Sequence, residues 1–303
     1  MSGKKIEIAY LGPKGTFSHE ALKAFLANEN TPKSIKDAEL IELNNFILFE
    51  TYLLVPEIDN DNKIFIPIEN SIGGSIPGNI DTLFWNNEEN SNIQIEAEHI
   101  QPIRHSIANL TGNLDDITMI ASHEQPIRQC SKYITDIKFK YLLDKDHEAP
   151  TKKYTASTVA GVEMAKKDKT IAAIAPHQTL IDAGLKIIAD DIQDNNNNAT
   201  RFVLVGHDKT QSTGNDKTSI AITLPADKAG ALYEVLGILA NSIPAINMTK
   251  IESRPAMVKM GEYWFFIDIE GHQDDEHIEK ALEKIKELAL DYRFLGSYPR
   301  FRR

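Results

Sequence analysis

The stretch that decides the fold is KKIEIAYLGPKGTFSHE, Lys4–Glu20, near the start of the sequence. Its first half, Lys4–Tyr10, contains a short alternation of apolar and polar residues and predicts a β-strand. The glycines that follow predict a tight turn, and the spacing of apolar residues from Glu20 to Ala27 predicts a helix. A strand, a glycine-rich turn and a helix in this order indicate an α/β fold.

Alternation of short apolar strands with helices continues along the chain. Strands are predicted at Ile64–Ile68, Ile93–Glu98, Ile117–Ala121, Thr170–Ile174 and Phe202–Val205, and helices near Ser122, Ser157 and Pro176. The polar segment Gly206–Lys217 then predicts a domain boundary.

After this boundary the predicted order is strand, helix, two strands, helix and strand. These elements are Thr218–Leu224, Gly230–Ala240, Ile246–Ser253, Tyr263–Glu270, Asp275–Leu288 and a segment near Phe294–Tyr298. The order is typical of a ferredoxin-like unit. No repeat of fixed period is visible, so we expect each part to form a closed globule.

Composition limits the classes of function. The 303 residues include 33 Lys and Arg and 44 Asp and Glu, a net charge of −11. At about 150 residues per domain, this length predicts about two domains. The acidic balance without a basic run argues against nucleic acid or an anionic membrane as the main partner. No segment approaches the roughly 18 apolar residues of a membrane span. Cys130 is the only cysteine, so we expect a cytoplasmic protein without an intramolecular disulfide.

Small and polar residues follow several predicted strands, where open α/β sheets carry their ligand crevices. They stand at Gly12–Ser18, Pro67–Ser75, Ser122–His123 and Thr155–Thr158. Each motif alone is more typical of a turn or a helix cap, but together they indicate a cleft lined by hydroxyls and amides. Gly12–Ser18 lacks the third glycine of a dinucleotide fingerprint and the ending of a P-loop, so we expect no nucleotide.

Charged and metal-binding residue types give weaker signals. Arg201 could be a fixed cation for a carboxylate or a member of a surface ion pair. Glu252 and Arg254 by themselves read as an exposed ion pair. His19, His105 and His123 stand in different predicted elements and lack the spacing of a metal site.

The motifs taken together resemble the monofunctional prephenate dehydratases with a C-terminal ACT regulatory domain. The resemblance rests on Leu11–Ser18, Pro67–Ser71, Ser122–His123 with Gln129–Cys130, Ser157–Thr158, Ala172–Ala175, Thr200–Phe202, Gly230–Leu232 and Thr249–Pro255, in this order. It implies a catalytic part, 1–207, with two α/β lobes like those of type 2 periplasmic binding proteins, 1–83 plus 185–207 and 84–184. A linker, 208–217, and an ACT domain, 218–303, would follow. The stretch Asn45–Lys63 departs from the family pattern.

The resemblance also implies the chemistry. Prephenate would lose carbon dioxide and its ring hydroxyl to give phenylpyruvate in phenylalanine biosynthesis, without a cofactor or a metal. Thr200 would relay or orient a proton at the leaving hydroxyl. The other catalytic residues implied are Asn70, Ser122 and Gln129. The substrate-binding residues implied are Arg201, for a carboxylate, with Gly15, Thr16, Phe17, Glu69, Ser71 and Phe202.

For the C-terminal part the resemblance implies a site for phenylalanine as a feedback effector, at a subunit interface. Its residues would be Gly230, Ala231, Leu232, Glu252, Ser253, Arg254 and Pro255. We accordingly expect a homodimer or homotetramer. Two alternatives stay open: arogenate as the substrate, which Ile72–Ser75 favours, and a ligand-binding protein of the same fold without catalysis.

Overall fold

The computed structural model describes residues 5–43, 61–76, 78–79, 81, 93–143, 148–225, 228–256 and 261–301. Most of the stretch Asn45–Lys63 lies outside the described residues. No helix in the described ranges is both long and apolar enough to cross a membrane.

The first lobe is built on a sheet of strand order β2-β1-β3-β11-β5, with the short β4 paired to β3. Its strands are β1 (Glu7–Leu11), β2 (Glu39–Leu43), β3 (Lys63–Asn70), β4 (Gly74–Ser75), β5 (Gln94–Pro102) and β11 (Ala199–Gly206), and the helices α1 (Phe17–Ala27) and α2 (Lys33–Lys36) belong to it. The apolar side of α1, with Ala21, Leu22 and Phe25, packs against Phe65, Phe202 and Leu204 of this sheet. The predicted strand, turn and helix at the start of the chain are confirmed.

The second lobe has a five-stranded sheet of order β10-β6-β9-β7-β8. Its strands are β6 (Ser106–Asn109), β7 (Met119–Ser122), β8 (Thr151–Tyr154), β9 (Ile171–Ala175) and β10 (Lys186–Ala189). Its helices are α5 (Glu124–Gln129), α6 (Ser131–Leu143), α7 (Thr158–Ala165) and α8 (His177–Asp182), with a 3-10 turn at Leu114–Asp116. The chain enters this lobe between β5 and β6 and leaves it between β10 and β11.

The predicted limits of the lobes, 1–83 plus 185–207 and 84–184, are therefore wrong in two places. Strand β5 pairs with β11 and belongs to the first lobe, whereas β10 pairs with β6 and belongs to the second. Position along the chain does not determine which sheet a strand joins, because pairing partners are distant in sequence. The crossovers lie near 103–105 and 190–198.

The C-terminal unit is a four-stranded antiparallel sheet of order β13-β14-β12-β15. Its elements are β12 (Asp216–Thr223), α9 (Ala231–Ala240), β13 (Met248–Pro255), β14 (Tyr263–Glu270), α10 (Glu276–Leu288) and β15 (Asp291–Pro299). Both helices pack on one face of the sheet through a core that contains Ile220, Val235, Ile267 and Ile285. This arrangement confirms the predicted ferredoxin-like order.

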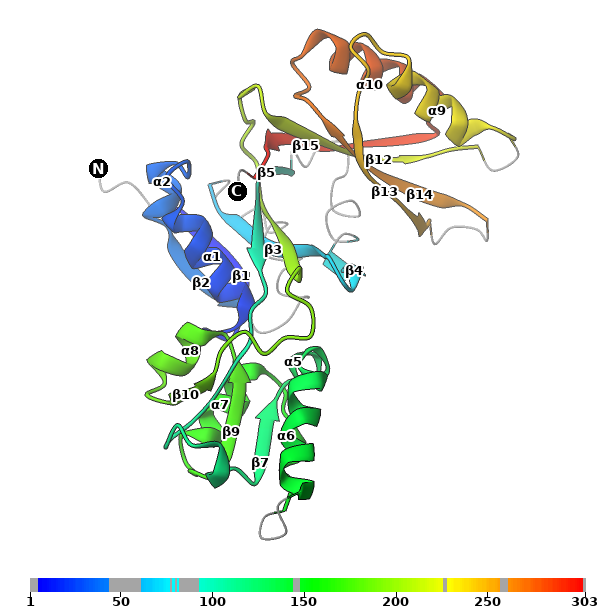
Figure 1. Ribbon diagram of the computed structural model, residues 1–303. Coiled ribbons are helices and arrows are strands. Elements are labelled where there is room, and N and C mark those ends of the chain that lie inside the picture. The colour runs from blue at the N-terminus through cyan, green and yellow to red at the C-terminus, as the bar shows by residue number, and fades with distance from the viewer. Residues whose placement is uncertain are drawn as a thin grey trace.

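The other face of the C-terminal sheet packs against the first lobe, so the molecule has three tiers (Figure 1). One core contains Ile64, Ile66, Val203 and Val205 of the first lobe together with residues of the C-terminal unit. These are Ala221, Ala256, Trp264, Phe266, Leu295 and Tyr298. The prediction that each part is a closed globule is wrong, because a sheet with two apolar faces must be covered on both.

Glycine permits the closest contact between these tiers. Gly296 of β15 has φ 128°, a conformation that other residues rarely adopt, and a Cβ there would lie 2.4 Å from the carbonyl oxygen of Ile95. The backbones of β15 and β5 could not approach this closely with any side chain at position 296.

Candidate active site

A cavity of about 390 Å³ lies between the two lobes. The first lobe contributes Phe17, Ser18, Pro67, Asn70, Gly73, Gly74, Ser75, Ile76, Thr200 and Phe202, the crossover contributes Ile103 and His105, and the second lobe contributes Gln125, Pro126 and Gln129. Five residues that the sequence predicted for the site line it: Phe17, Asn70, Gln129, Thr200 and Phe202. The polar groups that line it are hydroxyls, amides and one imidazole.

Asn70 and Thr200 form the polar centre of the first-lobe wall. They are directly paired residues of β3 and β11. Asn70 Nδ2 donates to Thr200 Oγ1 at 3.0 Å and to Asn198 Oδ1 at 2.8 Å. Asn70 Oδ1 accepts from the backbone N–H groups of Ile72 and Gly73, so the turn after β3 fixes the amide. Because the Thr200 hydroxyl accepts from Asn70, its own proton is left to donate.

Gln129 and His105 form a second polar pair. His105 Nε2 lies 2.9 Å from Gln129 Oε1, and since that oxygen can only accept, Nε2 carries the proton. Burial lowers the pKa of His105, which keeps the ring neutral. With its oxygen engaged, the Gln129 side chain has its NH₂ group left as a donor.

The start of α1 reaches the cavity only with Phe17 and Ser18. Gly15, predicted for the site, has φ 89° and donates its N–H to His19 Nδ1, while the Thr16 N–H donates to the carbonyl of Pro13. Thr179 of α8 also donates to the Gly15 carbonyl at 2.8 Å. Gly15 and Thr16 therefore shape the turn and its contact with the second lobe rather than line the cavity.

The structure contradicts the expected placement of Arg201. Neighbouring residues of a strand point to opposite faces, and Thr200 and Phe202 face the cavity, so Arg201 faces the C-terminal unit. Its guanidinium lies 2.5 Å from Asp268 Oδ2, 2.7 Å from the Tyr298 hydroxyl and 2.8 Å from Glu98 Oε2. The side chain is buried, and these groups take up its charge away from the cavity.

Three other predicted residues also lie outside the cavity lining. Ser122 is fully buried and donates to the carbonyl of Ile174 at 2.6 Å. Ser71 donates to the Asn197 carbonyl and accepts from the Ala199 N–H. Glu69 is paired in register with Arg201 and lies 3.3 Å from Lys250 Nζ. Local hydrogen bonds hold Ser122 and Ser71 outside the cavity, and the strand position of Glu69 directs it toward Lys250.

None of the described residues that line the cavity is Lys or Arg. Positive potential there comes from dipoles, above all the N-terminus of the eleven-residue helix α1 at Phe17 and Ser18. No cluster of three His, Cys, Asp or Glu side chains that could hold a metal ion occurs among the residues that the structure describes.

Among the lining residues that the sequence did not assign to the site are His105 and Ser75. His105 was considered only as a metal ligand, although it stands between two apolar strands, at a crossover. Ser75 belongs to the motif Pro67–Ser75, which predicts part of a cleft without singling this residue out, and its hydroxyl contacts Lys250 Nζ at 2.8 Å and also Glu252. The first could have been found from its position between strands, whereas the second depends on contacts remote in sequence.

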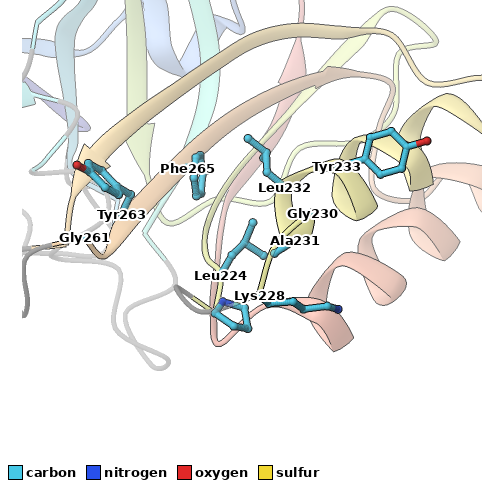
Figure 2. Close-up of a pocket in the computed structure, with 10 residues that line it drawn as sticks. Leu224, Lys228, Gly230, Ala231, Leu232, Tyr233, Gly261, Tyr263 and Phe265 are labelled. Atoms are coloured by element: carbon cyan, nitrogen blue, oxygen red, sulfur yellow. The ribbon is translucent and has the colours of Figure 1, made fainter.

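A second cavity, of about 270 Å³, lies at the start of α9 in the C-terminal unit. Figure 2 shows Leu224, Leu232 and Phe265 grouped there, with the Tyr233 ring directed away from them. Gly230, with φ 85°, precedes the helix, and Gly230, Ala231 and Leu232, three residues of the effector site that the resemblance implies, all line the cavity.

Glu252 and Arg254 do not line this second cavity. They pair in register with Phe266 and Trp264, which face the first lobe, and Arg254 binds Asp81 through two hydrogen bonds of 3.1 and 2.8 Å. Ser253 and Pro255 pair with Phe265 and Tyr263, which do line it. Alternation along β13 thus divides the predicted set between the two faces of the sheet.

Comparison with known proteins matches both parts of the chain to described families. A family model described as prephenate dehydratase matches residues 8–210, and one described as ACT domain matches residues 218–287. The chain is 33% identical over 302 residues to prephenate dehydratase of Methanocaldococcus jannaschii, covering 97% of this chain and 98% of that protein. It is 32% identical over 300 residues to bifunctional chorismate mutase/prephenate dehydratase of Aquifex aeolicus, with coverage of 98% and 74%.

Solved structures give the same result. A crystal structure of prephenate dehydratase in complex with L-Phe from Arthrobacter aurescens matches with a TM-score of 0.78 and 30% identity, covering 97% of this chain and 90% of that chain. These similarities confirm the predicted two-lobed fold with a C-terminal ACT domain.

Proposed function

The chain belongs to the prephenate dehydratase family and is a lyase of that activity, and we propose that the cavity between its lobes is the active site. The observation that carries this proposal is the hydrogen bond from Asn70 Nδ2 to Thr200 Oγ1 on the cavity wall. It orients a hydroxyl whose proton is available to a group in the cavity.

The reaction needs one proton and no electron acceptor. The bond between the ring and its carboxylate breaks, carbon dioxide leaves, and that electron pair enters the ring as the bond to the ring hydroxyl breaks. The departing oxygen takes up a proton and leaves as water, and the ring becomes aromatic. Thr200 donates a hydrogen bond to the departing oxygen and relays the proton, since an alkanol is too weak an acid to supply it alone.

The substrate carries two carboxylates, which must be held without a lysine or arginine from the described lining. The N-terminus of α1 at Phe17 and Ser18 supplies backbone dipoles for one carboxylate. The second carboxylate would accept from the NH₂ group of Gln129, which lines the cavity from the second lobe. Neutral His105 fixes that amide, so the donors are oriented before the substrate enters.

A pair of variants at Thr200 tests this assignment. Thr200→Val keeps the shape but removes the hydroxyl, and we expect kcat to fall by about 10²–10³-fold, as for loss of one preorganised donor. Thr200→Ser keeps the hydroxyl and should retain most of the activity. Phenylpyruvate formation from prephenate is the measurement, with circular dichroism to verify folding. A fully active Thr200→Val variant would refute the role of Thr200.

Substrate choice is tested in the same assay. We propose prephenate over arogenate, and wild-type protein should form phenylpyruvate from prephenate faster than phenylalanine from arogenate. A higher kcat/KM for arogenate would reverse that preference, and no product from either would favour a binding protein without catalysis.

We further propose L-phenylalanine as an effector of the ACT domain, since the relative from Arthrobacter aurescens was crystallised with it. The apolar cavity at Leu232 and Phe265 suits a benzyl side chain, and the exposed backbone at Gly230 suits its polar end. Inhibition of turnover by phenylalanine, and its loss in Leu232→Glu but not in the exposed Ile243→Glu, would support this site.

The ACT sheet also has an unpaired edge. β13 is the end strand of its sheet, and Ile251 on it is 40% exposed. We propose a homodimer or homotetramer that uses this edge, and sedimentation of wild-type and Ile251→Lys proteins would test it.

A further inference from the structure

A buried ionic cluster lies on the face of the β3–β11 strand pair that is opposite the cavity, and it joins these strands to the ACT domain. Arg201 of β11 contacts Asp268 of β14 and Tyr298 of β15, both from the ACT domain. Ser219 of β12 binds the same two ACT partners, at 2.5 Å to Asp268 Oδ1 and 2.6 Å to the Tyr298 hydroxyl. Glu98 of β5 joins Arg201 to Lys217 of the ACT domain, at 2.8 and 2.7 Å. The cluster thus connects β5 and β11 of the first lobe with β12, β14 and β15 of the ACT domain.

The pairing of β3 with β11 places this cluster one residue from the catalytic pair. Thr200 is in register with Asn70, and Arg201 with Glu69. The first pair faces the cavity, and each member of the second pair is held by the ACT domain. Glu69 lies 3.3 Å from Lys250 Nζ of β13, and the same ammonium lies 2.8 Å from the hydroxyl of Ser75, a cavity residue.

Such an arrangement transmits small displacements. Consecutive Cα atoms are a fixed distance of about 3.8 Å apart, so a shift of Arg201 with the ACT sheet moves Thr200 with it. Misplacement of a catalytic group by about 1 Å can lower a rate by about 10²-fold. The position of the ACT sheet therefore bears on the Thr200 hydroxyl directly.

We propose that Arg201 is a positioning residue that couples the ACT domain to Thr200, and that it is not a ligand of the substrate. The proposal rests on the proposed catalytic role of Thr200. A change in the ACT domain that moves Asp268 or Tyr298 changes turnover through β11, with no ligand passing between the two sites.

The chain provides a matched control at the other end of β11. There Lys63 is fully buried and lies 2.8 Å from both Glu96 and Asp208, next to Gly206. Glu96 is as buried as Asp268, at 8% and 6% exposed. At about 3.3 Å per residue, Gly206 is about 20 Å along the strand from Thr200. Glu96→Gln and Asp268→Asn each remove one buried negative charge with little change in shape.

The first experiment compares steady-state kinetics of the full chain. Asp268→Asn and the milder Tyr298→Phe should lower kcat, by about tenfold for the former, with KM for prephenate within about twofold. Glu96→Gln should leave both constants within about twofold while lowering the melting temperature as Asp268→Asn does. Arg201→Lys should behave like Asp268→Asn. If Arg201→Lys raised KM by more than about tenfold at unchanged kcat, Arg201 would be a substrate ligand and the proposal would be overturned. Equal losses of kcat in Asp268→Asn and Glu96→Gln would also overturn it.

The second experiment needs no turnover and so separates this proposal from the role of Thr200. Calorimetry gives the Kd of phenylalanine with and without saturating phenylpyruvate, the product, and the ratio of the two values measures the coupling. We expect a ratio that differs from one in wild type and in Glu96→Gln, and that moves to one in Asp268→Asn and Tyr298→Phe. A wild-type ratio of one, or an unchanged ratio in both cluster variants, would overturn the coupling. A fully active Thr200→Val would refute the catalytic assignment while leaving this ratio measurable.

Discussion

The two faces of the β3–β11 strand pair differ in how they use charge. The cavity face carries neutral donors, Asn70 and Thr200, whereas the face toward the ACT domain carries Glu69 and Arg201 in an ionic cluster. In the proposed active site a dianionic substrate would meet dipoles and amides, whereas Arg201, the cation next to Thr200, contacts the ACT domain. A charged residue next to a residue of the proposed active site can thus form its contacts on the opposite face of the sheet.

Removing one charge from the ACT-facing cluster should have the largest effect on stability. Asp268→Ala leaves Arg201 buried without its closest partner, and we expect a loss of about 3–5 kcal/mol in the free energy of unfolding. Urea unfolding followed by circular dichroism is the measurement. The double variant Arg201→Met/Asp268→Leu, which removes both charges, should recover most of the loss. A loss below about 1 kcal/mol in Asp268→Ala would mean that the cluster is solvated.

Changing the donor on the cavity face should alter catalysis with little effect on stability. Asn70→Asp replaces the NH₂ group that holds Thr200 with an acceptor, so the hydroxyl turns its proton toward residue 70. We expect kcat to fall by about 10²-fold, close to the loss of one oriented donor. Ser71→Ala, one residue away and outside the cavity, is the matched control and should stay within about twofold of wild type. Similar losses in both variants would place the cause in the turn rather than in the donor.

Acid should distinguish the buried clusters at the two ends of β11, around Arg201 and around Lys63, by the sign of its effect on stability. Burial alone would raise the pKa of Asp268, but Arg201 and Lys217 bring it below its ordinary value. Its stabilisation is therefore present above about pH 4 and is lost as pH falls through the lowered pKa. Burial raises the pKa of Glu96 despite Lys63, so the folded state favours its neutral form and gains stability as pH falls toward the raised pKa.

The corresponding measurement is the destabilisation of each variant against wild type at several pH values. Between about pH 7 and about pH 4.5, the penalty of Asp268→Asn should stay constant, and that of Glu96→Gln should grow. Below about pH 4 the Asp268→Asn penalty should shrink. If the penalties of Asp268→Asn and Glu96→Gln changed in the same direction as pH falls, the two clusters would not differ in their electrostatics as we expect.

Salt should have the smallest effect. With no Lys or Arg among the described cavity residues and a net charge of −11, the substrate gains little from screened attraction. The KM for prephenate should change by less than about threefold between about 0.05 and 0.5 M potassium chloride. A rise of more than about tenfold would reveal a cation at the substrate carboxylates.

Sequence patterns predicted most of the fold because central strands such as β11 are apolar on both faces. Val203 and Val205 pack toward the ACT sheet, while Phe202 and Leu204 pack under α1, so the run is apolar throughout. Strands such as β8, whose residues Thr151–Tyr154 are all exposed, carry no such pattern and were missed. Their pairing depends on neighbours that the sequence does not identify.

The site was predictable in type but only partly in membership. Asn70, Gln129 and Thr200 line the cavity as the resemblance implied. Thr200 and Arg201 are adjacent in a strand, and side chains alternate between the two faces of a sheet, so these two side chains could not both face the cavity. Which of them faced the cavity depended on the ACT domain, whose acidic and phenolic groups lie 67 and 97 residues away along the chain.

The core shared by the first lobe and the ACT sheet limits how the chain could be divided or recombined. A cut near residue 210 would bare Ile64, Ile66, Val203 and Val205 on one sheet face, and such a contiguous apolar surface promotes aggregation. An ACT domain exchanged from a relative would have to bring apolar residues equivalent to Trp264 and Leu295, and a glycine where β15 touches β5. The ACT sheet and the first-lobe sheet together enclose one core, so the ACT domain is not an independent module on this face.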